Sequence, residues 1–221
     1  MSVALITRKT RRLSSIAVAG AAALVSLAAA GRAGGQSARP SHTADDVKFM
    51  QNMISHHAQA LEMTALVPAR TTRREIRLLA ERIEISQKDE IALMQRWLTD
   101  RHELVPDTHG SRGPDHHPPG HEMAMSAAHM PGTLMPGMLT AEQLSQLASK
   151  KGPEFDRLFL EDMIGHHEGA LVMVKALLGT NGAAQEPEIF RFTSDIDADQ
   201  RAEIMRMRAL LSGTSGGTPR R

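Results

Sequence analysis

One segment occurs twice in this chain. Residues 46–63 and 156–173 are identical at nine of eighteen positions, and both carry a His-His pair, in FMQNMISHHAQALEM and FLEDMIGHHEGALVM. A second pair of similar segments follows at 75–98 and 188–211, displaced by 113 rather than 110 residues because the connection GTNGAAQEP is three residues longer. A repeat of this kind predicts two copies of one supersecondary unit.

Apolar residues recur at helical spacing in all four repeated segments, with no alternating β-pattern. Neither pair of helices can bury its apolar stripe alone, whereas two pairs packed together can. The pattern predicts an all-α fold, an antiparallel four-helix bundle built from two repeated αα-hairpins with pseudo-twofold symmetry. The expected helices are 45–67, 73–100, 154–178 and 187–212, with a short additional helix introduced by a Thr140 and Gln143 capping box and ending near Lys150.

The N-terminus has the pattern of a targeting segment. Four basic residues precede an apolar run at 16–30, which is short for a membrane span and ends in small residues, with possible cleavage after Ala30 or Ala33. We expect an exported protein, periplasmic or secreted, with no stable membrane span after cleavage; Sec and twin-arginine export both stay open, and an uncleaved anchor is the alternative. The expected organisation is a signal peptide at 1–30, a flexible N-terminus at 31–44, the first helical hairpin at 45–100, a His/Met/Pro/Gly-rich loop at 101–138, the second helical hairpin at 139–212 and a disordered tail at 213–221.

Composition excludes several classes of partner and site. Cleavage after residue 30 removes four basic and no acidic residues, so the formal charge falls from +1 to −3, which argues against nucleic acid. The chain has no cysteine, which suits an oxidising compartment and excludes thiolate metal sites, iron–sulfur clusters and a lipid-bearing cysteine. With 3% aromatic residues, the core must consist largely of Leu, Ile, Ala and Met.

The paired histidines lie on the apolar half of their helices. In the first copy His57 falls near the middle of that half beside Met53, and His56 lies nearer its edge beside Met63. A buried ring nitrogen without a hydrogen bond or a metal costs about 1 to 3 kcal/mol, and imidazole with thioether favours copper. The candidate metal ligands are Met53, His56, His57, Met63, Met163, His166, His167 and Met173.

Two further polar positions repeat on the second helix of each hairpin. Glu90 and Glu203 fall within the apolar stripe, as do Gln87 and Gln200. A carboxylate on a core face needs a partner, and the histidine pair of the preceding helix can supply one. We expect these four residues to orient the imidazoles from behind, with each carboxylate within hydrogen-bond reach of a histidine.

The central loop has a composition of its own. Residues 101–138 contain six His and five Met among many Pro and Gly, and thioether among imidazoles indicates copper rather than zinc or iron. A solvated linker remains the alternative. The candidate auxiliary metal residues are His116, His117, His121, Met123, Met125, His129 and Met130.

Both halves therefore share one pattern. It begins with Asp and Phe, continues with Met-Ile, one variable residue and His-His, and ends with Ala and Met. Gln, Glu-Ile and Met follow in the next expected helix. This resembles the signature of a bacterial, exported, ferritin-like family of unknown function that includes copper-binding members. The resemblance covers roughly 45–211 except the central loop. It implies a ferritin-like four-helix bundle outside the cytoplasm, with Cu(I) or Cu(II) bound by the His and Met residues of the two motifs.

Three functions remain open from the sequence. The first is copper binding for storage, resistance or delivery, with affinity that weakens as the pH falls through the ordinary histidine pKa of about 6.5. The second is a metal oxidase, which the absence of any Glu-x-x-His spacing makes the weakest of the three. The third is a non-metal bundle that acts through partner contacts, in which a buried His/Gln/Glu network only fixes the helix register. The sequence leaves the oligomeric state open.

Overall fold

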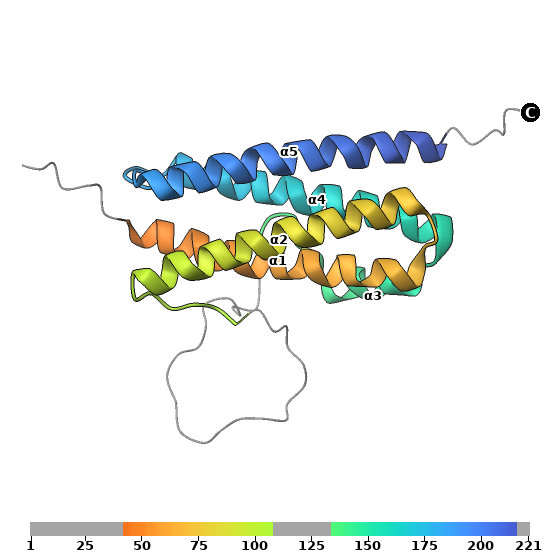
Figure 1. The fold of residues 1–221 in the computed structure, drawn as a ribbon, viewed down its shortest axis with the longest axis horizontal. Helices are drawn as coiled ribbons and strands as arrows, with labels where there is room; N and C mark the ends of the chain where they lie inside the picture. The colour runs from red at the N-terminus through yellow and green to blue at the C-terminus, as the bar shows by residue number, and fades with distance from the viewer. Residues whose placement is uncertain (1–41, 108–133, 216–221) are drawn as a thin grey trace, which may run out of the picture. The chain divides into compact units, whose positions relative to one another are not determined.

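Four long helices lie side by side in the computed structural model, which describes residues 42–107 and 134–215 (Figure 1). The helices are α1 (Ala44–Arg70), α2 (Arg74–Asp100), the short α3 (Ala141–Ser149), α4 (Gly152–Leu178) and α5 (Pro187–Ser215). The described residues contain no strand, so the predicted all-α bundle is confirmed. None of these helices is both long and apolar enough to cross a membrane.

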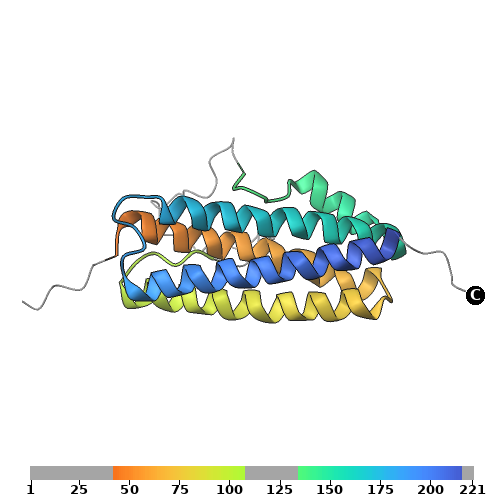
Figure 2. The ribbon, with the colours of Figure 1, turned by 90° about the horizontal axis from the view of Figure 1, so that it is seen from above.

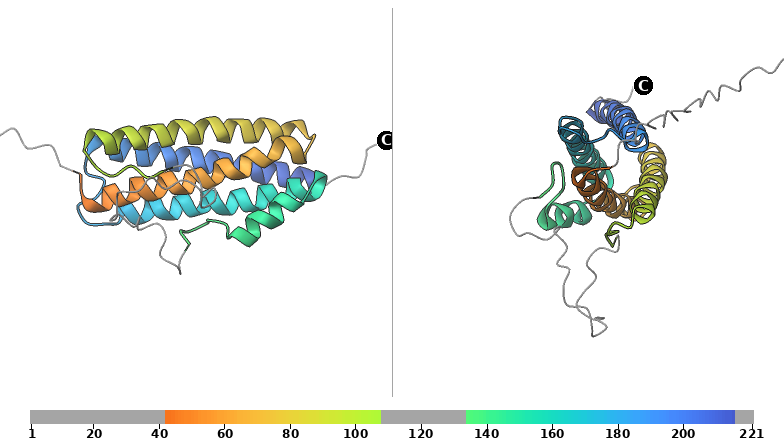
Figure 3. Two further views of the ribbon diagram at one scale, coloured as in Figure 1. Left: turned by 90° about the horizontal axis from the view of Figure 1, so that it is seen from below. Right: turned by 90° about the vertical axis from the view of Figure 1, so that its left-hand side faces the viewer.

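The two hairpins pack through their first helices. α1 packs along α2, α4 along α5, and α1 against α4, whereas α2 and α5 have only sparse contact. The end-on view shows the four long helices around a common centre, with α3 outside them beside α1 and α4 (Figure 3). The predicted capping box at the start of α3 is present, because the Thr140 hydroxyl accepts from the backbone of Gln143 and the Gln143 side chain accepts from the backbone of Thr140.

Several predicted boundaries differ from the structure; the starts of α1, α2 and α4 shift by one or two residues, to Ala44, Arg74 and Gly152. α1 continues past residue 67 to Arg70 with Pro68 in its last turn, because a proline there loses a single N–H bond and its fixed φ suits a helix. α5 continues to Ser215, so the first three residues of the tail predicted at 213–221 are helical; helix ends are the least certain part of a sequence prediction. The described ends of the predicted loop at 101–138 are packed rather than free, since the carbonyl of Leu104 accepts from Gln51 at one end.

A polar layer divides the core into two apolar clusters. One cluster joins the start of α1, the end of α2, the end of α4 and the start of α5, and the other joins the opposite ends. This pairing of starts with ends shows that α1 and α4 are antiparallel, as are α2 and α5. The polar layer lies between the clusters on all four helices and consists of His56, His57, Gln87, Glu90, His166, His167, Gln200 and Glu203.

Residues 134–140, hereafter the strap, lead into α3 and cross the outer side of α4 (Figure 2). A turn begins the strap, with the N–H of Met138 donating to the carbonyl of Met135 over 3.1 Å. Gly137 has φ +77°, which suits glycine at the third position of a type II turn after proline. The turn fits against α4 because Gly169 has no side chain: a Cβ there would lie 2.0 Å from the carbonyl oxygen of Pro136.

The two glycines of α4 give a matched test of this contact. A Cβ on Gly165 would meet nothing within 4 Å, so Gly165→Ala should stabilise the fold by up to about 1 kcal/mol through helix propensity. Gly169→Ala should instead destabilise it by about 1 to 3 kcal/mol, because the methyl group collides with the strap. Chemical denaturation of the two variants measures both values, and equal stabilisation by the two alanines would mean that the strap does not lie on α4.

Candidate metal centre

The four motif histidines all lie in the polar layer at the centre of the bundle. None is more than 1% exposed. α1 and α4 bring the two His-His pairs together because each places its pair midway along the helix, where the antiparallel helices face each other. The sequence prediction that both pairs lie on the core face is therefore confirmed.

The second histidine of each pair is held by a carboxylate from the other helix of its own hairpin. His57 Nε2 lies 2.5 Å from Glu90 Oε2, and His167 Nε2 lies 2.7 Å from Glu203 Oε2. Ser86 adds a hydroxyl that donates to the other oxygen of Glu90 over 3.3 Å. A carboxylate accepts, so each Nε2 carries the proton and donates; in the neutral ring Nδ1 is then left with a lone pair. The expected contacts of both carboxylates are thus present.

The first histidine of each pair meets its counterpart from the other hairpin. The rings of His56 and His166 lie face to face, with centroids 3.9 Å apart and an interplanar angle of 38°. The strap makes these equivalent residues different, because the carbonyl of Pro136 accepts from His56 Nε2 over 2.9 Å. Both ring nitrogens of His166 are buried and neither makes a hydrogen bond of good geometry, although the backbone of His56 lies close enough to raise the pKa of the ring, as the smallest of its causes.

Burial keeps these two rings neutral. Burial first, and then the nearby His57, together lower the pKa of His56 to about 3. Burial is also the main reason that the pKa of His166 lies well below 6.5, with His56 and His167 as additional causes. A neutral imidazole is the form that ligates a metal, so both rings are available to one at neutral pH.

Unpartnered ring nitrogens gather in this layer. These nitrogens are His56 Nδ1, His57 Nδ1, His166 Nδ1, His166 Nε2 and His167 Nδ1. Even so, no group of three or more His, Asp or Glu side chains within 42–107 and 134–215 is arranged to hold a metal. The imidazoles therefore offer pairs of donors, and a complete coordination shell needs ligands of another kind or a shift of the rings.

The motif methionines flank the layer on both sides. Met53 packs in one apolar cluster with Met173 beside it, and Met63 and Met163 pack in the other. Met173 alone is partly exposed. Each side of the polar layer thus has one methionine from each hairpin, as the pseudo-twofold symmetry requires.

The two glutamines also lie in the polar layer, but neither is seen to orient an imidazole among the described residues. Gln87 and Gln200 are both 1% exposed, and their amide oxygens have no hydrogen-bond partner. Among the described residues, no hydrogen bond joins either amide to an imidazole, unlike the two carboxylates. The predicted positions of the glutamines on the core face are correct, and their predicted contact with the histidines is absent.

The carboxylates connect the layer to solvent through two grooves between α2 and α5. One groove reaches Glu203 and the other reaches Glu90, and both share Ser86 and Asp199 in their lining. Partial burial raises the pKa of Asp199, and the nearby charges of Glu90 and Glu203 raise it further. The α2–α5 side of the layer is therefore acidic, whereas the α1–α4 side is covered by the strap.

Sequence reasoning missed the residues that fix the strap. The helical pattern places Gln59 on the polar half of α1, yet it is buried: its Nε2 donates to the carbonyl of Leu139 over 2.9 Å and its Oε1 accepts from the N–H of Leu139 over 2.7 Å. One signal was available, since the repeat has Gln59 in one copy and Gly169 in the other. The candidate residues of the central loop, at 116–130, lie outside the described residues.

Solved structures similar to this one include two proteins described by family alone. A DUF305 fragment from Deinococcus radiodurans is 30% identical and covers 78% of this chain and 99% of its own, with a TM-score of 0.59. A candidate secreted DUF305 protein from Streptomyces coelicolor is 26% identical and covers 80% and 98%, with a TM-score of 0.61.

CopM is a third similar structure. Its Cu(II)-bound form is 27% identical and covers 76% of this chain and 96% of its own, with a TM-score of 0.55, and similar structures include its Cu(I)- and silver-bound forms. A comparison with curated proteins finds no match. Residues 46–211, which include both repeats and the polar layer, match the family described as Domain of unknown function (DUF305), and the chain belongs to that family.

Proposed function

We propose that this protein binds copper at its polar layer, through the imidazoles of both hairpins and the methionines beside them, and that it does so after export. The observation that supports this most directly is the set of buried ring nitrogens without partners around the His56–His166 contact. The similarity to CopM in copper- and silver-bound forms supports the choice of a soft ion. The task is storage, resistance or delivery of that copper.

The unpartnered nitrogens favour a metal over a network that only fixes helix register. Each unsatisfied buried polar atom costs about 1 to 3 kcal/mol, so a purely structural network is expected to satisfy its members. Here the two carboxylate bonds are made, while both nitrogens of His166 are left without a partner. In the neutral ring one of these nitrogens carries the proton and the other has a lone pair, which a bound ion would use.

Copper fits this set of donors better than a hard ion does. Imidazole suits Cu(II), thioether suits Cu(I), and the layer offers the first flanked by the second. The absence of a three-ligand group of His, Asp and Glu within the described ranges also suits an ion that accepts sulfur. Export rests on the basic and apolar N-terminal segment and on the similarity to a candidate secreted relative.

Removal of the central imidazole pair is the direct test. The double variant His56→Gln and His166→Gln should bind copper at least about 100-fold more weakly, equal to about 2.8 kcal/mol, because both donors at the contact are lost. His102→Gln, at an exposed position, is the matched control and should keep the full affinity. Copper titration with a competing chelator measures each affinity. If the folded double variant binds copper as tightly as the parent, the layer is not the site.

Burial also changes the pH range over which copper is expected to be released, compared with the expectation from the sequence alone. Exposed imidazoles with a pKa near 6.5 lose a metal below that pH, whereas His56, whose pKa is about 3, stays neutral. Copper in the layer should therefore stay bound at pH 5 and be released only as the pH approaches 3. Titrations at pH 7 and 5 check this. A tenfold loss of affinity for each pH unit below 6.5 would contradict it.

The carboxylates should tune affinity without touching the ion. Glu90→Gln with Glu203→Gln removes both charges behind the imidazoles and should weaken copper binding about 10- to 100-fold. Glu62→Gln, on the exposed face of α1, is the control and should have no effect. Circular dichroism establishes that each variant is folded, and affinity in the double variant equal to that of the parent would exclude the orienting role.

A further inference from the structure

The strap carries two methionines that have no counterpart in the repeat. Met135 and Met138 are the first and fourth residues of the turn, joined by the hydrogen bond from the N–H of Met138 to the carbonyl of Met135. The Cα atoms at those positions of a β-turn lie within about 7 Å of each other. Both side chains are half-buried. The turn thus brings the backbone positions of two methionines close together.

The turn is fixed in place from three sides. It sits against Gly169 of α4, and its next residue, Leu139, makes two hydrogen bonds to Gln59 of α1. The capping box of α3 follows directly. A binding site on a preordered turn loses little conformational freedom when an ion binds, which favours affinity.

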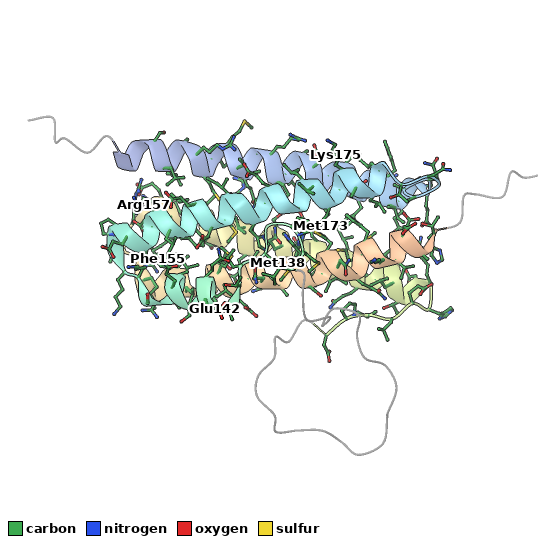
Figure 4. All side chains as sticks on the ribbon, turned by 180° about the vertical axis from the view of Figure 1, so that it is seen from behind. Met138, Glu142, Phe155, Arg157, Met173 and Lys175 are labelled. Carbon is green, nitrogen blue, oxygen red and sulfur yellow. The ribbon has the colours of Figure 1, made fainter. Side chains whose placement is uncertain are left out.

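The same turn adjoins the buried imidazole pair. Pro136, its second residue, accepts the hydrogen bond from His56. A Cβ on Gly137, its third residue, would lie 2.9 Å from the carbonyl oxygen of His166. Figure 4 looks onto this face of the bundle and labels Met138 on the strap and Met173 on α4. Met135 and Met138 therefore flank Pro136 and Gly137, the two residues of the turn that adjoin His56 and His166.

We propose that Met135 and Met138 form a second binding site, for a soft monovalent cation such as Cu(I), in the strap that covers the α1–α4 side of the polar layer. Thioether sulfur is a neutral, soft donor that selects Cu(I) and Ag(I) over hard or divalent ions. The inner partner for such an ion is His166, both of whose ring nitrogens lack a hydrogen bond. This proposal rests on copper binding by the layer, and it adds a second site over the side of the layer that the strap covers.

The competing explanation is that the two methionines only cover α4 with apolar surface. Leucine has nearly the volume of methionine and would cover α4 equally well, but it offers no sulfur. The double variant Met135→Leu and Met138→Leu therefore separates a ligand role from packing. Met205→Leu is the matched control, since Met205 is 65% exposed on α5, away from the strap.

The experiment uses the intact chain with ¹³C-labelled methionine methyl groups, titrated with Ag(I) as a soft probe that does not change oxidation state. The methyl signals of Met135 and Met138, assigned from single leucine variants, should shift with the bound ion, and that of Met205 should not. The double variant should lose the Ag(I) binding step that shifts these two signals in the parent, whereas its affinity for Cu(II) changes less than twofold. The Met205 control should match the parent.

The outcomes separate this proposal from the one on which it rests. Unmoved methyl signals, or as many Ag(I) ions bound by the double leucine variant as by the parent, overturn the strap site even if the His56/His166 variant loses copper. Shifted methyl signals with unchanged copper binding in that histidine variant support the strap site and overturn the site in the layer. A parent chain that binds neither Ag(I) nor copper overturns both.

Discussion

The two buried carboxylate–imidazole bonds set the register of the whole bundle. Each joins the two helices of one hairpin, His57 to Glu90 and His167 to Glu203, in a layer where solvent offers no substitute partner. A slip of either hairpin by one helical turn would leave a charged carboxylate opposite apolar side chains, at a cost of several kcal/mol. The apolar clusters on both sides supply the stabilisation, and the layer decides which residues face one another.

The pseudo-twofold axis passes through the contact between His56 and His166, so equivalent residues meet there and everything else is duplicated around them. Two features break this symmetry. The strap covers one side of the contact alone, and the buried Asp46 accepts a hydrogen bond over 2.7 Å from the N–H of Ala184 in the longer connection between α4 and α5. Its counterpart Asp156 has an oxygen without a partner. Chemically distinct positions thus arise at equivalent places in the two copies of the repeat.

Helix periodicity was enough to predict the fold and the place of the histidines. The spacing of Glu90 from the apolar residues around it placed its carboxylate on the core face, and the core face of the neighbouring helix had only histidines to offer it. Gln59 could not be placed in the same way. Its burial depends on a segment eighty residues away, and helical periodicity describes only what one helix presents, not what later crosses it.

The sparse contact between α2 and α5 has a consequence for how the protein meets acid. Local opening starts where packing is weakest, so water is expected to enter along this seam and to reach Glu90 and Glu203 before any ring nitrogen. A proton that arrives from solvent then meets a carboxylate first. Exchange between this layer and solvent therefore begins at the carboxylates, and the ring nitrogens behind them are reached last.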